Sequence, residues 1–197
     1  FDGSQDYVLL DRAPTAFTGS NPRTFCAWVF HDTLSECAFV HLHDTASSTG
    51  KKWTLRSEAG RNLRIELEGS GYTSGLKCGA NSNDAGRDWA FVCVTYNGGN
   101  LSGHRLGVGA INKLSDSTTS VERNIQFENA TGTNSVDTGG DYFVIGANNR
   151  ATTPVNFMNG AMADVRGYDR VLSDDELQTV MEWGYRNIIK APVRGLV

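Results

Sequence analysis

Residues 160–177 read Gly-Ala-Met-Ala-Asp-Val-Arg-Gly-Tyr-Asp-Arg-Val-Leu-Ser-Asp-Asp-Glu-Leu, a pattern that predicts a strand leading directly into a capped helix. Successive side chains of a strand point to opposite faces, which predicts two alternating sets: Met162, Asp164 and Arg166 against Ala163, Val165 and Gly167. Ser173 is a favoured N-cap residue, and Glu176 three positions later is typical of a capping box. We therefore expect one buried strand face and a helix that begins at Asp174.

The rest of the chain is a series of short strands separated by turn residues. Runs of β-branched and aromatic residues recur between clusters of Gly, Asn, Asp and Ser. The other expected strands are residues 7–10, 24–30, 36–42, 53–56, 63–67, 89–96, 105–108 and 142–145, and the closing strand extends over 155–165. A turn at residues 31–35 predicts that the second and third strands form a hairpin.

Only one segment has a convincing helical pattern, from Asp174 to about Arg186. Leu177, Val180, Met181 and Gly184 share one face of this helix, so we expect it to lie on a sheet. About a dozen strands with one short C-terminal helix predict an all-β fold, an antiparallel β-sandwich or barrel.

The composition predicts one domain and excludes two classes of partner. The 197 residues are enough for a single sandwich core, and the formal net charge of −4 comes with scattered Lys and Arg. A nucleic-acid partner is therefore not expected, and no apolar stretch predicts membrane insertion. The chain starts at Phe1 and shows no signal peptide, so we expect a processed piece of a longer parent.

Cysteines and glycosylation sequons favour an extracellular, secreted or cell-surface location. The four cysteines allow three disulfide pairings and lack the two-residue spacing of zinc sites. The triplets Asn100-Leu-Ser102 and Asn129-Ala-Thr131 are acceptor sequons in polar stretches, so we expect glycans on Asn100 and Asn129.

Several motifs along the chain carry a family resemblance. These are Phe1-Asp2-Gly3 with Asp6-Tyr7-Val8, then residues 24–29 (Thr-Phe-Cys-Ala-Trp-Val), 88–98 (Asp-Trp-Ala-Phe-Val-Cys-Val-Thr-Tyr-Asn-Gly) and 159–177. In this order they resemble the laminin-G-like, concanavalin A-like jelly-roll domains. The resemblance implies a domain over residues 1–190 followed by a tail at 191–197, with two curved antiparallel sheets and the first and last strands side by side. Such domains bind carbohydrates or proteins, and polysaccharide-degrading enzymes share the fold.

A catalytic function would need acids that the sequence supplies only in part. Glu66 and Glu68 project from one face of a strand, as the carboxylate pair of a retaining glycosidase could. The jelly-roll glycosidases, however, look like Glu-x-Asp-x-x-Glu at this element, and here Glu stands in the middle place and Gly71 in the last. We expect instead a solvated outer face that includes Arg64.

Two further clusters have a chemical and a structural interpretation. Arg56-Ser57-Glu58 faintly resembles the arginine-rich strand of alginate lyases, but the paired Tyr and Lys of those enzymes are missing, so surface charges at Arg56, Arg61 and Arg64 are favoured. His41 and His43 could chelate a metal, yet no third ligand is identifiable and an exposed strand end with hydrated imidazoles is favoured.

Calcium is the expected cofactor. Hard cations take six to eight oxygen ligands, which distant parts of a sandwich can supply together. Because the resemblance places the first and last strands side by side, the expected ligands are Asp2, Asp6 and Asp164.

A carbohydrate site needs an aromatic face for the sugar ring and planar polar groups for its hydroxyls. Aromatic residues beside polar stretches meet the first need, with an Asn-Asn-Arg run close by, so the expected ligand-binding residues are Trp53, Tyr72, Phe157, Asn148, Asn149 and Arg150. The other tryptophans, Trp28, Trp89 and Trp183, are expected in the core.

The sequence thus predicts a non-catalytic extracellular recognition module. Its expected partner is a glycan or an extracellular protein within a larger surface assembly. A polysaccharide-degrading jelly-roll enzyme is the alternative, and a purely structural building block is a third possibility.

Overall fold

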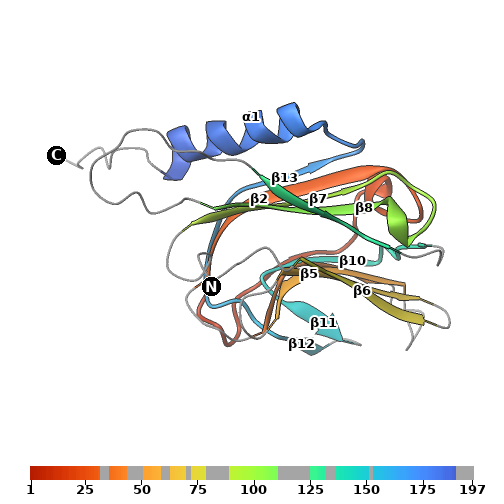
Figure 1. Cartoon of the computed structure of the whole chain (residues 1–197). Coiled ribbons are helices and arrows are strands. Elements are labelled where there is room, and N and C mark those ends of the chain that lie inside the picture. Colours follow the sequence, from red (N-terminus) through yellow and green to blue (C-terminus); the bar gives the residue numbers. More distant parts are fainter. Residues whose placement is uncertain are drawn as a thin grey trace.

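A computed structural model of the chain describes residues 1–31, 36–43, 51–58, 63–69, 72–78, 89–110, 125–131, 136–150 and 153–189. Two antiparallel sheets pack face to face, and a helix covers the outer face of one of them (Figure 1). The six-stranded sheet has the order β1 (Val8–Leu10), β10 (Tyr142–Ile145), β3 (Cys37–His43), β4 (Lys52–Ser57), β5 (Leu63–Gly69) and β6 (Tyr72–Cys78). The five-stranded sheet has the order β13 (Gly160–Tyr168), β2 (Arg23–His31), β7 (Ala90–Tyr96), β8 (His104–Ala110) and β9 (Gln126–Asn129).

Four smaller elements complete the described chain. A hairpin of β11 (Asn148–Arg150) and β12 (Thr153–Val155) lies on the side of the six-stranded sheet that faces away from the helix (Figure 1). Two single 3-10 turns, η1 (Thr15–Phe17) and η3 (Leu101–Gly103), precede β2 and β8. The hairpin therefore defines one end of a stack whose other end is the helix.

The core lies between the sheets and follows the two-residue period of the strands. Inward side chains of β4 and β5, among them Leu55 and Ile65, pack with those of β2 and β7, among them Val29 and Val92. Apolar surface removed from water in this way contributes roughly 25 cal/mol per Å². The same period sends the intervening side chains of β4 and β5 to the outer face.

The helix α1 (Asp174–Gly184) begins as the sequence predicts and runs into a single π-helical turn, η4 (Tyr185–Ile189). Ser173 Oγ accepts a hydrogen bond from the Glu176 amide, and the Glu176 carboxylate accepts one from the Ser173 amide. Leu177 and Met181 are buried against Trp28 of β2 in a second apolar cluster. None of the helices described here is long and apolar enough to cross a membrane.

The predicted all-β sandwich with one C-terminal helix is confirmed, but two predicted connections are wrong. Strands β2 and β3 lie in different sheets, so residues 31–35 do not close a hairpin. The expected strand at 155–165 is two strands, because the chain leaves the extended conformation at Asn156, where φ is 52°.

The closing strand also departs from simple alternation. Asp164 has a φ of 50°, and the register of β13 on β2 shifts between Ala163 and Arg166. This irregularity is a β-bulge, which turns Asp164 toward α1 and leaves Val165 exposed.

The first strand does not pair with the last one. Strand β1 pairs with β10, whereas β13 pairs with β2. The chain start does reach the beginning of the closing strand: Phe1 exchanges two hydrogen bonds of 3.0 Å with Gly160, and Asp2 forms a bridge with Asn159.

Candidate functional site

The outer face of the six-stranded sheet carries an unusual concentration of buried charge. Strands β4 and β5, the residue after β4 and the residue before β3 together contribute three cations and three carboxylates. We call this set the ion network: Glu36, Lys52, Arg56, Glu58, Arg64 and Glu66.

The inner half of the ion network centres on Glu66. Lys52 Nζ donates a hydrogen bond of 2.7 Å to Glu66 Oε1, and Arg56 Nη1 lies 2.8 Å from Glu66 Oε2. The second contact is an ion pair without hydrogen-bond geometry, since Oε2 has no hydrogen-bond donor. All three side chains are less than a tenth exposed, at 5% for Lys52, 8% for Arg56 and 9% for Glu66.

The outer half leads from Arg56 to the rim of the sheet. Arg56 Nη1 lies 2.5 Å from Glu36 Oε1, and its Nη2 lies 3.8 Å from Glu58 Oε1. Glu58 also accepts a hydrogen bond from Arg64. The Glu36 side chain is 40% exposed, so the ion network reaches solvent at this end.

The strand register explains why these charges meet. Glu66 lies opposite Thr54 and therefore diagonal to both Lys52 and Arg56 on β4. Arg56 and Arg64 are directly opposite one another, an unfavourable pairing of like charges. The carboxylates around these two guanidinium groups offset that repulsion.

Burial of these charges is costly for stability, which points to a purpose other than folding. Buried ion pairs are often no more stabilising than apolar residues of similar volume. Burial raises the pKa of Glu66, but the hydrogen bond from Lys52 and the charges of Lys52, Arg56 and Arg64 outweigh it, so the pKa lies below its ordinary value. Glu66 is thus an ionised carboxylate, and the prediction that it lies on a solvated face is wrong.

Two stacked histidines continue the same face toward β10. The rings of His41 and His43 are 5.6 Å apart and nearly parallel, and His41 Nδ1 lies 2.8 Å from Thr54 Oγ1. Both histidines are buried, so the predicted hydrated strand end is wrong. The register of β3 on β4 shifts at a bulge between Ala38 and Val40. Because of this bulge the Phe39 side chain points into the core, on the opposite side of the sheet from the two histidines.

The β11–β12 hairpin brings three predicted ligand-binding residues to this side of the sheet. Strand β11 contacts β3, and the Asn148 side chain is fully buried with no hydrogen-bond partner on Nδ2 or Oδ1 among the described residues. Asn149 and Arg150 follow it on β11 and pair with Pro154 and Thr153, but their side chains lie outside the described part of the chain.

The segment after the hairpin joins the ion network to exposed aromatic rings. Asn156 Nδ2 donates a hydrogen bond of 3.1 Å to Glu36 Oε1, and the Asn156 carbonyl accepts one from Ala38. The next residue, Phe157, is half-buried with its ring centroid 6.3 Å from that of Tyr7. We call Tyr7 and Phe157 the aromatic pair; the sequence predicted Phe157 as a binding residue and missed Tyr7, because no local pattern links residues so distant in the chain.

The other predicted aromatic residues lie elsewhere. Trp53 lies within β4 and is only 2% exposed, so this predicted ligand-binding residue is buried in the core. Strand alternation turns it inward, where its Nε1 donates a hydrogen bond of 3.3 Å to His104 Nε2. Tyr72 begins β6, and its side chain lies outside the described residues. Trp183 was expected in the core but is 49% exposed.

The expected calcium ligands do not form a cluster. Asp2 accepts hydrogen bonds from Ser4 and Gln5, and these contacts lower its pKa to about 2. The Asp2 amide donates to Asp6, whereas Asp164 accepts from Arg166 Nε at 2.7 Å. Within the described ranges, no group of three or more His, Cys, Asp or Glu side chains is placed to hold a metal ion.

The predicted modification sites are accessible in different degrees. Asn129 is exposed at the end of β9, whereas Asn100 is partly buried and accepts a hydrogen bond of 2.6 Å from Ser102. Cys26 and Cys93 are free thiols, and burial raises the pKa of Cys26 and Cys37 to about 12. The Cys78 side chain lies outside the described residues.

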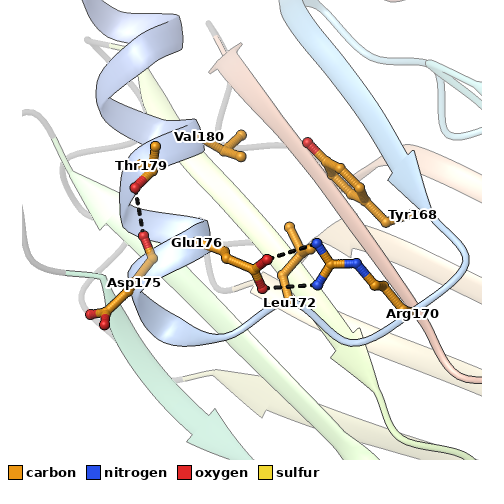
Figure 2. Close-up of a pocket in the computed structure, with 7 residues that line it drawn as sticks. All are labelled: Tyr168, Arg170, Leu172, Asp175, Glu176, Thr179 and Val180. Atoms are coloured by element: carbon orange, nitrogen blue, oxygen red, sulfur yellow. Dashed lines mark hydrogen bonds and ion pairs between the residues drawn. The ribbon is translucent and has the colours of Figure 1, made fainter.

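A concave region lies beside α1 (Figure 2). This groove has a volume of about 310 Å³ between the end of β13 and the helix, next to Tyr168 and Val180. Its polar groups bind one another: Arg170 donates two hydrogen bonds to Glu176, and Thr179 donates to the Asp175 carbonyl (Figure 2). These bonds hold the first turn of the helix, so we regard the groove as structural and the outer face of the six-stranded sheet as the candidate site.

Solved structures of several proteins share this architecture. The CBM40 of the Ruminococcus gnavus IT-sialidase, solved with alpha2,3 sialyllactose, matches with a TM-score of 0.58 and 15% identity over 89% of this chain and 96% of that one. The LG1-3 region of the laminin alpha2 chain matches with a TM-score of 0.58 and 18% identity over 85% of this chain and 30% of that one.

An enzyme appears among these structures as well. The enzymatically active domain of bacteriophage CBA120 tailspike protein 2 matches with a TM-score of 0.60 and 14% identity over 93% of this chain and 26% of that one. Neither a family model nor a curated protein sequence matches this chain. At these identities the likeness establishes the fold alone, and the chain has the concanavalin A-like jelly-roll fold.

Proposed function

We propose that this chain is a non-catalytic extracellular recognition module that binds carbohydrate on the outer face of its six-stranded sheet. The observation that carries the proposal is that Asn156, which donates a hydrogen bond to Glu36 of the ion network, directly precedes Phe157 of the aromatic pair. The CBM40 solved with sialyllactose has the same fold, which adds support for a glycan ligand.

The aromatic pair supplies the apolar contact that a sugar ring needs. Tyr7 is 41% exposed, and its ring plane is tilted by 46° against that of Phe157, so the two rings form a V. A pyranose presents one apolar face of C–H groups that packs on such a ring, while its hydroxyls remain free for polar partners.

The polar partners are held in place before a ligand arrives. Glu36 is fixed by Arg56 and Asn156, and Arg64 is fixed by Glu58. Side chains that are already ordered lose little conformational entropy on binding, which favours affinity for a small, hydroxyl-rich ligand. Calcium as a cofactor and glycans on Asn100 and Asn129 remain part of the proposal.

The second candidate function is polysaccharide cleavage, and the observation that favours it is the ionised Glu66. An anionic carboxylate between cations could act as a nucleophile or stabilise a positive transition state. The reaction also needs an acid with a raised pKa, and none of the described carboxylates with a resolved pKa shift has one.

A glycan array with and without calcium tests the proposal. The array includes neutral and sialylated glycans, and the proteins are the unchanged chain, Tyr7→Ala, Phe157→Ala and the control Trp183→Ala. Each change in the aromatic pair is expected to weaken binding by roughly tenfold or more, as the loss of an aromatic stacking contact does. The control removes an equally exposed ring from α1 and should bind like the unchanged chain.

Parallel assays for reducing sugar and unsaturated uronate separate the two functions. Turnover of any polysaccharide would overturn the non-catalytic proposal. If no glycan on the array is bound, with or without calcium, the carbohydrate proposal is overturned and a protein-contact or building-block role is favoured.

A further inference from the structure

Two Asn-Gly pairs occur in the sequence, Asn97-Gly98 and Asn159-Gly160. This dipeptide is chemically labile, because glycine has no side chain to shield its backbone nitrogen from the side chain of the asparagine before it. The fold places the two pairs in different surroundings, so we expect their reactivities to differ.

The Asn97-Gly98 pair lies in the connection that follows β7, with both reacting groups accessible to one another. Asn97 is exposed, and neither its side-chain amide nor the Gly98 backbone nitrogen makes a hydrogen bond to a described residue. Gly98 has a φ of 94°, a conformation that favours glycine. The labile dipeptide is therefore part of the geometry of this turn.

The Asn159-Gly160 pair is held at both of its residues. The Gly160 backbone nitrogen donates a hydrogen bond of 3.0 Å to the Phe1 carbonyl, and Asn159 forms a bridge with Asp2. Asn159 is also half-buried against Gly3, where an added Cβ would stand 2.9 Å from the Asn159 Cβ. A reaction at this pair requires the chain start to open away from the closing strand.

From these two environments we infer that Asn97 is a site of spontaneous deamidation. The Gly98 nitrogen attacks Cγ of the Asn97 side chain, the Cγ–Nδ2 bond breaks, and the side-chain nitrogen leaves as ammonia with the proton that Gly98 has lost. Water then opens the cyclic succinimide at either of its carbonyls, which gives aspartate or isoaspartate at this position.

Either product changes the connection between β7 and β8. Both carry a negative charge that asparagine lacks, and isoaspartate also adds a carbon atom to the main chain. The Asn97 backbone amide donates a hydrogen bond of 3.0 Å to the Gly103 carbonyl, and the Tyr96 hydroxyl donates one of 3.1 Å to the Gly99 carbonyl. The longer main chain therefore shifts the Gly99 carbonyl relative to Tyr96.

Incubation of the full chain in mildly alkaline buffer, followed by peptide mapping with mass spectrometry, measures conversion at both pairs. We expect Asn97 to react at least about tenfold faster than Asn159, because the exposed turn reacts without the opening that the hydrogen-bonded pair requires. An isoaspartyl methyltransferase with a labelled methyl donor should detect isoaspartate in the unchanged chain. Asn97→Gln is the control and should remain unlabelled, since glutamine forms its cyclic imide much more slowly.

Unfolding separates the effect of the fold from that of the dipeptide. In guanidinium chloride the two pairs should react at rates within about twofold of each other, since the fold no longer protects Asn159. Equal rates in the folded chain, faster conversion of Asn159, or no conversion of Asn97 would overturn the inference. A difference that persists unchanged after unfolding would overturn it as well. The glycan array uses freshly prepared protein, so the two proposals fail separately.

Discussion

Gly184 at the end of α1 lies directly against the Asp164 carboxylate of β13. A Cβ built on Gly184 would stand 2.6 Å from Asp164 Oδ2 and 2.6 Å from Trp28 Nε1. The bulge at Asp164, with its φ of 50°, turns the carboxylate toward the helix, while Trp28 comes from the adjacent strand. The position where the helix meets the five-stranded sheet therefore has no room for a side chain.

We predict that Gly184→Ala lowers the stability of the fold. In a helix alanine is favoured over glycine by about 1 kcal/mol, so an open site would gain stability. Here the methyl group meets a rigid indole and a carboxylate, and overpacking of this kind costs about 1–3 kcal/mol. Thermal unfolding measures the net change, with Thr179→Ser as the control, because this exposed position lies on the same helix and serine keeps the hydroxyl that bonds the Asp175 carbonyl. A higher melting temperature for Gly184→Ala would contradict the contact.

Buried His104 makes stability depend on pH. Its Nε2 accepts a hydrogen bond from Trp53, and its Nδ1 lies 3.1 Å from the Leu101 carbonyl, an arrangement that suits the neutral ring. Burial is the main cause that lowers the pKa of His104 to about 4, and the charge of Arg23 adds to it. The unfolded chain takes up this proton near pH 6.5, so the folded state loses stability as the pH falls from there toward 4.

We expect a loss of about 1 kcal/mol between pH 7 and 5.5 from this one group. Urea unfolding at the two pH values measures the loss, since ordinary carboxylates remain ionised over most of that range. His104→Gln cannot titrate, so its stability should change less over the same interval. An equal slope for both proteins would show that His104 is not the source.

The architecture could be predicted because it depends on local patterns. The capping box at Ser173, the apolar helix face and the two-residue period of β4 and β5 are each visible in a few consecutive residues. The prediction of a hairpin between β2 and β3 failed because turn residues in the sequence do not reveal whether the next strand stays in the same sheet. The prediction of one continuous strand through Asn156 failed because the positive φ of this residue depends on contacts with Glu36 and Ala38, more than a hundred residues away.

The candidate site was harder to predict for the same reason. Alternation correctly placed Arg64 and Glu66 on an outer face, but only the register of β4 on β5 brings Lys52 and Arg56 to them. Phe157 was a reasonable candidate from its polar neighbours. Tyr7 joins it through a tertiary contact between residues 150 positions apart, which leaves no mark in the sequence.

Removing the charge of Glu66 should be strongly destabilising. Glu66→Gln leaves Lys52 and Arg56 buried without their shared anion, and breaking a buried pair costs about 3–5 kcal/mol. Glu182→Gln is the matched control, because the exposed pair of Glu182 with Arg186 is worth about 0.5 kcal/mol or less. Chemical denaturation compares the two variants.

The pH dependence of the unfolding free energy gives a second test of the role of Glu66. Its pKa is lowered in the folded state, so its stabilising effect is complete above the ordinary value and is lost as the pH falls through the folded value. If Glu66→Gln and Glu182→Gln lower the unfolding free energy by similar small amounts, water reaches the ion network.

Asn148→Leu should raise stability, because it replaces a buried side-chain amide that makes no hydrogen bond to a described residue by an apolar group of similar size. Both polar atoms of the Asn148 side chain are buried and lack a hydrogen-bond partner in the part of the chain that the structure describes. An unpaired buried polar group costs about 1–3 kcal/mol, and an apolar isostere removes that cost. Unfolding by urea measures the gain, and the glycan array shows whether the amide serves binding instead. A variant that is less stable than the unchanged chain would show that a bound water or another group already satisfies Asn148 in the free protein.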